Sequence, residues 1–355
     1  MNIPVTLTKT PKPKPDSENL PFGKIFTDHM FIMDWSEDAG WHGARIIPYG
    51  PLCLDPAATV FHYAQTAFEG LKAYRAKDGR VLVFRPEKNA ARMNLSAERL
   101  CMPPLPDGAL TEALDAVVKL ERDWIPTGDN TSLYIRPWMM GTGAALGVHP
   151  STEYIFAIIL APSGPYYKEG INPIRIRIED RMVRAVRGGS GFTKAAANYA
   201  ISLRGQTDAE AEGFAQVLWL DGVERKYIDE VGAMNVFFVL DGQLVTPSLD
   251  EGNILAGVTR DSIIHLAKSW GMTVSERRIP AEELFSAHAA GKFTEAFGAG
   301  TAAVISPIGE LKWHERDITI NNNEVGPVSR RIYDELTGMQ YGRLPDKFGW
   351  IHEVV

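Results

Sequence analysis

Apolar residues recur along the chain with two periods, which predict both strands and helices. Near-continuous apolar runs cover residues 132–140 and 153–161, and the second run is apolar enough to be a strand buried on both faces. Residues 108–125 instead place leucine and valine at roughly helical spacing, which predicts an amphipathic helix. Residues 80–86 predict a further strand, and the sequence after Pro86 favours a helix over 87–100.

The second half of the chain shows shorter apolar runs separated by turn residues. Three of these runs predict strands, at residues 216–221, 227–231 and 234–240. The Asp241-Gly242 pair is a hairpin signature and predicts another strand at 243–246. Helices are expected over residues 257–270 and 326–340.

The length of the chain and its turn residues predict two domains. A chain of 355 residues is long enough to form two domains of ordinary size, each with its own core. Residues 1–21 contain Lys-Pro-Lys-Pro and lack the apolar core of a secretory signal, so we interpret them as an extended arm. Residues 164–174 have the turn chemistry of a linker. A smaller domain over 22–163 and a larger one over 175–355 are therefore expected.

Composition excludes several classes of partner. The net charge is -7 with no block of like charges, so neither nucleic acid nor an anionic membrane is expected as a partner. The longest apolar runs, such as residues 154–162, are too short to cross a bilayer. The two cysteines, Cys53 and Cys101, have no metal-like spacing. They fit a reducing cytoplasm without disulfides or a metal site, and we interpret both as packing residues.

One lysine stands where reactive chemistry could be placed. Lys194 follows a glycine-rich bend at residues 188–191 and precedes an alanine-rich run with strong helix propensity. A lysine held at such a junction can project into a cleft, where partial burial lowers the pKa of its amine and makes it nucleophilic. Taken alone, however, the position fits a solvated surface lysine better.

Other polar residues are equally ambiguous one at a time. Arg92 lies near the second turn of the helix expected over 87–100, where it could pair with a surface acid or hold a phosphate. Tyr134 and Arg136 share one face of a strand, and an arginine in so apolar a strand is costly unless it meets an anion. Asp229 and Glu230 face opposite sides of their strand, so only one of them is expected to point inward.

Two glycine-containing segments offer backbone amides to an anion. Gly257 precedes a predicted helix start, where free amides and the helix dipole favour a negative group. Residues 298–301 break a strand with two glycines before Thr301, which is a second place where amides could meet a phosphate. Together with a lysine and an acid, these features match what pyridoxal phosphate requires: an amine for a Schiff base, an acid at the ring nitrogen, and phosphate donors.

The chain also resembles a known family through several ordered motifs. The fold-type IV pyridoxal-phosphate enzymes are matched by Lys194 with Asn198-Tyr199, Asp229-Glu-Val-Gly-Ala-Met-Asn235, Gly257-Val-Thr-Arg260 and Phe297-Gly-Ala-Gly-Thr301. Branched-chain amino acid aminotransferases of the longer subgroup are matched by Phe22-Gly-Lys-Ile-Phe-Thr-Asp-His-Met30, Phe68-Glu-Gly-Leu-Lys-Ala-Tyr74 and Ser132-Leu-Tyr-Ile-Arg-Pro137. The resemblance runs from Phe22 to the C-terminus in one order.

The resemblance implies a cofactor site. Lys194 would hold pyridoxal phosphate as a Schiff base and move the proton during the reaction, and it is expected to lie before its helix begins. Glu230, rather than Asp229, would face the pyridine nitrogen, and Tyr199 would hydrogen-bond the ring oxygen. The phosphate would be held by Arg92, Val258, Thr259 and Thr301.

The resemblance also implies a substrate site, with no metal. An aromatic wall for branched side chains would be formed by Phe22, Tyr63, Phe68, Tyr134 and Tyr166. Arg136, together with Tyr134, would bind the distal carboxylate of glutamate. Amides near Thr301 and Ala302 would bind the α-carboxylate of the substrate.

The function implied is reversible transamination between branched-chain L-amino acids and 2-oxoglutarate by a ping-pong mechanism. The implied fold is the two-domain α/β (α+β) architecture of fold-type IV enzymes, with mixed sheets, flanking helices and the lysine in the larger domain. A cytoplasmic homodimer is expected, in which Tyr63 and the small-residue loop 141–147 complete the site of the partner. The preference among leucine, isoleucine and valine stays open, because one methylene discriminates by only about 1–3 kcal/mol.

The sequence departs from the family pattern at a few positions, and it leaves alternatives open. Ala196-Ala197 replaces the more usual glycines, and Ala233 stands where some relatives have threonine. Ala303 and Ser306 occupy the places of a cysteine pair found in animal relatives, which excludes a thiol switch there. The alternatives are a D-amino acid aminotransferase, an aminodeoxychorismate lyase, and a pyridoxal-phosphate-binding protein without turnover.

Overall fold

The computed structural model describes residues 1–17, 20–164 and 171–354. Its contacts divide the chain into two compact units. The first comprises Met1–Lys168, Lys194–Ala196 and Gly338–Val355, and the second comprises Glu169–Thr193 and Ala197–Thr337. Residues 194–196 thus group with the first unit, although the chain on both sides of them belongs to the second. The domain boundaries expected from the sequence differ from this division and stay a prediction.

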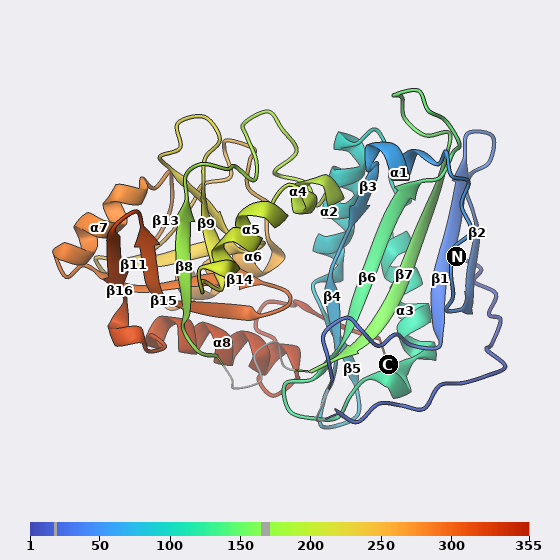
Figure 1. Ribbon diagram of the computed structural model, residues 1–355. Coiled ribbons are helices and arrows are strands. Elements are labelled where there is room, and N and C mark those ends of the chain that lie inside the picture. The colour runs from blue at the N-terminus through green and yellow to red at the C-terminus, as the bar shows by residue number, and fades with distance from the viewer. Residues whose placement is uncertain (18–19, 165–170, 355) are drawn as a thin grey trace. The chain divides into compact units, whose positions relative to one another are not determined.

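The first unit is built on an eight-stranded sheet with the order β17-β5-β4-β6-β7-β1-β2 and β3 paired with β6 (Figure 1). Its strands are β1 (His29–Ser36), β2 (Gly40–Pro48), β3 (Thr66–Phe68), β4 (Leu71–Arg75), β5 (Val81–Phe84), β6 (Ser132–Gly141), β7 (Glu153–Ser163) and β17 (Ile351–Glu353). Every described pair in this sheet is antiparallel. Strand β17 comes from the far end of the chain and pairs with β5, placing Ile351 opposite Phe84.

Helices pack against this sheet and complete its core. They are α1 (Thr59–Tyr63), α2 (Pro86–Arg99) and α3 (Ala109–Leu120), with a short 3-10 turn at Arg122–Trp124. The apolar face of α3, which includes Leu110, Leu114 and Val117, is fully buried in the same core as the strands. The helix expected over 108–125 therefore forms, but it ends at Leu120 and continues as the 3-10 turn.

The second unit contains a nine-stranded mixed sheet with the order β10-β9-β8-β15-β14-β11-β12-β13 and β16 paired with β15. Its strands are β8 (Ile174–Glu179), β9 (Gln216–Leu220), β10 (Ile228–Val231), β11 (Asn235–Leu240), β12 (Gln243–Thr246), β13 (Val274–Glu276), β14 (Phe293–Gly300), β15 (Val304–Trp313) and β16 (Arg316–Thr319). The parallel pairs are β8 with β9, β8 with β15, and β12 with β13.

The remaining helices are α4 (Ala196–Ala200), α5 (Leu203–Ala211), α6 (Val258–Ser269), α7 (Ala281–Ala289) and α8 (Pro327–Gln340), with a 3-10 turn at Asn321–Asn323. In the second unit, Leu284 and Phe285 of α7 enter a core shared with strand residues such as Phe238 and Phe293. The burial of these rings and aliphatic side chains supplies the main stabilising term of the unit.

The structure confirms the α/β fold class and the strands and helices expected from the apolar pattern. Of the two sheets, the second is mixed and the first is antiparallel. The interpretation of Cys53 and Cys101 as packing residues was wrong, since both are free and exposed. Among the described residues, no helix is long and apolar enough to cross a membrane. The same part of the chain contains no group of three metal-ligating side chains.

Candidate active site

Hydrogen bonds made by Asn198 shape the bend that precedes Lys194. The side-chain amide of Asn198 donates to the carbonyls of Ser190, at 2.8 Å, and Thr193, at 3.0 Å. The Ser190 hydroxyl donates back to the Asn198 oxygen at 2.7 Å. These three hydrogen bonds fix the chain between the glycines and helix α4, because they satisfy two backbone carbonyls and the Asn198 side chain within the bend itself. Lys194 lies before α4, as the sequence predicts.

The backbone of Lys194 is anchored within the first unit. Its amide donates to the Ser96 hydroxyl at 3.0 Å, and its carbonyl accepts from the Phe68 amide at 3.1 Å. The adjacent Ala195 forms an isolated antiparallel bridge with Ala67. The Lys194 amine lies 4.7 Å from the centre of the Phe68 ring. The backbone of Lys194 is thus held by groups from β3 and α2.

The surroundings of Lys194 favour a neutral amine. Burial, with the positive charge of Arg92 acting in the same direction, lowers the pKa of Lys194 from 10.5 to about 8. The negative charge of Glu69 raises this pKa and limits the shift. At pH 7 about a tenth of such an amine is unprotonated, compared with well under a thousandth for an ordinary lysine. The structure therefore favours nucleophilic or proton-accepting chemistry at this atom.

Arg92 is held by a buried carboxylate rather than at the surface. Its Nε atom and one terminal nitrogen donate to the two oxygens of Glu69, each at 2.8 Å, and the amide of Asn89 donates to Glu69 at 2.7 Å. Glu69 is fully buried. Although burial opposes ionisation, the Arg92 guanidinium and the Asn89 amide hold the pKa of Glu69 below its ordinary value. A surface pair for Arg92 is therefore excluded, and Glu69 is a site residue whose role the sequence did not assign.

An aromatic and cationic cluster lies on the first sheet. The Arg136 guanidinium lies 4.7 Å from the Phe68 ring centre and 5.3 Å from that of Tyr134, and it donates to the Tyr134 hydroxyl at 3.1 Å. Phe22 meets the Tyr134 ring edge-on at 5.0 Å. At Gly70, a Cβ atom would overlap the Tyr134 hydroxyl. The Nε atom of Arg136 is buried and has no hydrogen-bond acceptor among the described residues, which suits it to an anionic ligand.

One of the expected substrate residues, Tyr63, is not brought into this cluster. The Tyr63 hydroxyl instead donates to the carbonyl of Leu146 in the loop after β6, and its side chain is exposed. Tyr166 lies outside the residues that the structure describes.

The second unit brings Glu230 and Tyr199 to one cavity. Its empty volume is about 320 Å³ including the open mouth, and it is lined by Arg184, Thr193, Asn198, Tyr199, Ser202, Glu230, Gly232, Ala233 and Leu255. Glu230 accepts hydrogen bonds from the Asn235 side chain and the Leu255 amide, both at 3.1 Å. Its other oxygen lies 3.3 Å from the Arg184 guanidinium. These donors stabilise a negative charge on a carboxylate that is only 4% exposed.

The start of α6 adjoins the same residues. Val258 and Thr259 open this helix after Gly257, and a Cβ at Gly257 would overlap the side-chain oxygen of Asn235. Asn235 therefore contacts both Glu230 and the start of α6. The motif in the sequence includes Asn235, but the sequence did not indicate this role. The first amides of a helix have no intrahelical acceptor, so they favour an anion.

Thr301 and Ala302 occupy the turn between β14 and β15. The chain leaves this turn through Val304, which has a φ of 62°, an uncommon value for a β-branched residue. Such backbone is characteristic of functional turns. The role of these two residues at the substrate stays a prediction.

Asp229 and Glu230 do face opposite sides of β10, but the expectation that only one points inward was wrong. Asp229 is 3% exposed and Glu230 is 4% exposed. The Asp229 side chain enters a separate pocket, where the Asn253 amide donates to it at 2.8 Å. Strand alternation identified the opposite faces, but it could not show that both faces are covered.

Comparison with known proteins identifies relatives over nearly the whole chain. Residues 66–311 match the family model described as amino-transferase class IV. The branched-chain-amino-acid aminotransferase 2 of Bacillus subtilis is 55% identical over 352 residues, covering 99% of this chain and 97% of the relative. The branched-chain-amino-acid transaminase 1 of the same organism is 52% identical, covering 97% and 96%.

Solved structures give the same result at lower identity. The branched-chain amino acid aminotransferase of Escherichia coli superposes with a TM-score of 0.73 at 28% identity, covering 91% of this chain and 98% of that one. A second branched-chain amino acid aminotransferase, from the organism abbreviated T.th. and solved with pyridoxamine 5'-phosphate, gives a TM-score of 0.75 at 28% identity, with the same coverage.

Replacing Glu69 with glutamine should lower the free energy of unfolding by about 3–5 kcal/mol at pH 7, because Arg92 would keep a buried charge without its partner. The matched control is Asp78→Asn, which removes an exposed carboxylate paired with Arg80 and should change stability little. Urea unfolding of both variants checks this. Equal losses of unfolding free energy in the two variants would show that the buried pair stabilises the fold no more than the exposed one.

The pH dependence of the same variant has a definite sign. Because the pKa of Glu69 is lowered in the folded protein, its ionised form stabilises the fold above about pH 4.5, and this contribution is lost as the pH falls through the folded value. The Glu69→Gln variant should therefore lose less stability than the natural protein between pH 5 and pH 3. A steeper loss in the variant would contradict this assignment.

Proposed function

Because the chain belongs to the amino-transferase class IV family, we propose that it transfers an amino group between branched-chain L-amino acids and 2-oxoglutarate, with pyridoxal phosphate as cofactor. Relatives that bear the branched-chain aminotransferase name are 52–55% identical over almost the full length. The observation that carries the proposal is Lys194, a lysine whose amine has a pKa of about 8 and whose backbone is fixed on both sides.

The described residues fit the cofactor by their chemistry. Lys194 offers the amine that attaches it, and Arg92 and the amides at the start of α6 offer donors for its phosphate. Glu230 and Tyr199 line one cavity and offer an acid for the ring nitrogen and a hydroxyl for the ring oxygen. Glu230 lies 3.3 Å from the Arg184 guanidinium, and a positive neighbour favours the carboxylate form that a protonated ring nitrogen needs as its partner.

Bound pyridoxal phosphate supplies the electron sink that acidifies the Cα proton of an amino acid. The chain supplies proton transfer and positioning. Lys194 would act as the neutral amine that accepts the Cα proton and gives one back, and its lowered pKa suits that role. Glu230 would keep the ring nitrogen protonated, and Arg92 would hold the phosphate.

We assign Arg136 to the distal carboxylate of glutamate and the aromatic cluster to branched side chains. Phe68 and Tyr134 present ring surface to Arg136, and Phe22 packs against Tyr134. The same pocket must accept leucine and glutamate in alternate half-reactions. A planar cation stacked on rings can do this, because it offers ring surface to an apolar chain and N–H donors to a carboxylate.

Borohydride treatment of the holoenzyme should fix the cofactor to Lys194, and L-leucine added before treatment should change the visible spectrum of the cofactor. Peptide mapping and absorption spectra check both outcomes. A label on Lys226, or on Lys72, whose burial also lowers its pKa to about 8, would overturn the assignment of Lys194.

The same experiments separate the alternative functions. A spectrum that stays fixed with leucine would favour a protein that binds the cofactor without turnover. Turnover of D-alanine or aminodeoxychorismate without turnover of L-leucine would favour the other fold-type IV activities.

Replacing Arg136 with leucine should reduce kcat/KM for glutamate by about 10- to 100-fold, because a charge-assisted contact of roughly 1.5–3 kcal/mol is lost. The value for L-leucine should change much less, since its side chain brings no charge. Arg122→Leu, which removes an exposed arginine of the same unit, is the matched control. Equal losses for the two substrates would exclude Arg136 from carboxylate recognition.

We propose that the protein is a homodimer in which Tyr63 and the loop after β6 reach the partner. Phe61, Leu146 and Val148 are 61%, 70% and 86% exposed, and clustered exposed apolar side chains mark interaction surfaces. The Tyr63 hydroxyl joins α1 to this loop through the Leu146 carbonyl, so they form one surface.

Sedimentation of the active enzyme should give about twice the chain mass of 39.2 kDa. Leu146→Asp should raise the monomer fraction, because a charge would be buried in the interface. Leu203→Asp, at an equally exposed position of the second unit, should not. A fully active monomer would exclude a shared site.

We place the protein in a reducing compartment such as the cytoplasm, because Cys53 and Cys101 are both exposed free thiols. Alkylation of both thiols in freshly lysed cells would support this location, and blocked thiols would contradict it.

A further inference from the structure

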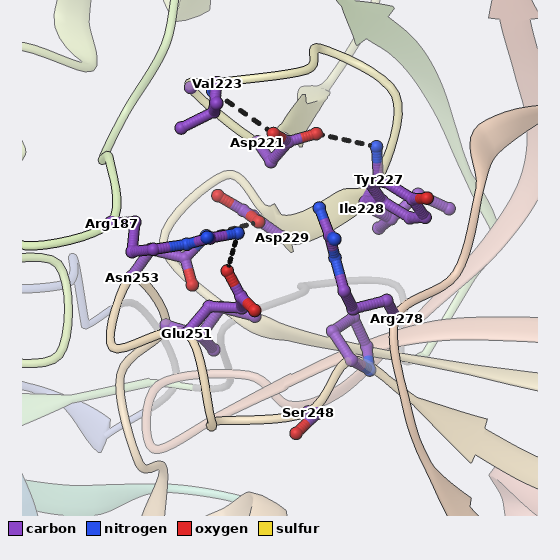
Figure 2. A pocket seen from close by; sticks show the side chains of 13 residues that line it. Arg187, Asp221, Val223, Tyr227, Ile228, Asp229, Ser248, Glu251, Asn253 and Arg278 are labelled. Carbon is purple, nitrogen blue, oxygen red and sulfur yellow. Dashed lines mark hydrogen bonds and ion pairs between the residues drawn. The ribbon is translucent and has the colours of Figure 1, made fainter.

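A second pocket lies on the opposite face of β10 from Glu230. Figure 2 shows Asp229 at its centre, with Arg187 and Arg278 on either side in this view. Its empty volume is about 370 Å³ including the open mouth, and its lining also includes Asp221, Tyr227, Ser248, Glu251 and Asn253. None of these residues belongs to the site described above, although Asp229 is the direct neighbour of its acid.

Most polar groups of this pocket already have partners. Both oxygens of Asp221 accept backbone amides of its own loop at 2.7–3.1 Å. Arg187 pairs with Glu251. Arg278 pairs with Glu224 at 2.7 Å and lies 3.6 Å from the Tyr227 ring centre. These groups can form the walls of a site, but they do not require a ligand.

Two side-chain oxygens of this pocket have no hydrogen-bond partner among the described residues. They are the Oδ2 atom of Asp229 and the Oδ1 atom of Asn253, and both are buried. Asp229 is 3% exposed and Asn253 is 4% exposed. The Asn253 amide donates to the other Asp229 oxygen at 2.8 Å, so the two orphan acceptors belong to one linked pair. Buried acceptors of this kind are costly unless a donor reaches them.

The Asp229 carboxyl lacks a counter-charge of its own. Burial raises its pKa to about 8, and the negative charges of Glu230 and Asp221 act in the same direction. Arg184 and the Asn253 hydrogen bond oppose this rise, but Arg184 is committed to Glu230. A donor that carries a positive charge would satisfy both orphan oxygens and stabilise the ionised carboxylate.

We propose that this pocket binds the primary ammonium group of a small molecule, with Asp229 and Asn253 as its acceptors. A primary ammonium has three N–H donors and one charge, which match two unpartnered oxygens and one carboxylate. On binding, Asp229 releases its proton to solvent and the ligand keeps all of its own. Ammonium itself, an organic amine, and an amino acid whose carboxylate reaches Arg187 or Arg278 share this chemistry.

The pocket is connected to the active site through Asn253. The carbonyl of Asn253 accepts from Arg184, which in turn contacts Glu230 at 3.3 Å. The same carbonyl packs against Gly191, where a Cβ would overlap it, in the bend that leads to Lys194. A ligand that holds Asn253 therefore restrains both the acid and the bend, and the coupling between the two sites is reciprocal.

The test uses holoenzyme whose cofactor has been fixed by borohydride, so that amines cannot exchange with it. The thermal midpoint is followed against ammonium chloride, methylammonium chloride and glycine, at constant ionic strength and pH 8. Each probe that binds raises the midpoint with its concentration. Tetramethylammonium chloride, which has no N–H donor, and sodium chloride are the controls and should have no specific effect.

Asp229→Asn should weaken the binding of the effective probe at least about tenfold, because the charged acceptor is removed. Asp241→Asn, which changes an exposed carboxylate paired with Lys292, should leave binding unchanged. In the natural protein, apparent affinity should fall about tenfold for each pH unit below 8, because the ligand competes with the proton on Asp229.

The three probes show which class of ammonium compound the pocket binds. Binding of ammonium and methylammonium alone indicates a simple amine, whereas markedly tighter binding of glycine indicates an amino acid. Equal effects of methylammonium and tetramethylammonium would overturn the proposal, as would full binding to Asp229→Asn. Affinity that is independent of pH between 6 and 8 would also overturn it, and this measurement needs no variant.

Discussion

The buried pair of Glu69 and Arg92 is the constraint on which the first unit and its chemistry depend. A carboxylate that is fully out of water is tolerated only because the guanidinium meets both of its oxygens and Asn89 supplies a third donor. The pair joins helix α2 to the residue that directly follows β3, and the same helix supplies Ser96 to the backbone of Lys194. The ion pair therefore holds the helix that also anchors the Lys194 backbone.

This pair also sets the charge around the reactive amine. Arg92 and Arg136 oppose protonation of Lys194, while Glu69 supports it, and burial decides the outcome. A single added or removed charge would shift that balance. Arg136 keeps a buried nitrogen without an acceptor among the described residues, which is an unfavourable state that an anionic ligand would relieve. An anion bound there would therefore gain binding energy from a donor that is unsatisfied in the free protein.

The apolar pattern predicted most strands and helices, because burial of alternate or helically spaced residues is a local property of the sequence. The motifs likewise identified Lys194, Arg92 and Glu230 as candidates. Position alone could not distinguish a surface pair from a buried one for Arg92, because its partner is 23 residues away. The pocket at Asp229 was not predictable either. It arises where segments far apart in the chain cover both faces of a short strand.

The pairing of β17 with β5 has a consequence for synthesis. The first unit contains the earliest part of the chain, yet one edge of its sheet stays unpaired until residues 351–353 have been made. Lys194 also reaches its contacts with Phe68 and Ser96 only after more than half of the chain has left the ribosome. An exposed edge strand can pair with a foreign strand. In the nascent chain this side of β5 therefore has no native partner until β17 has been made, so the sheet of the first unit is completed only then.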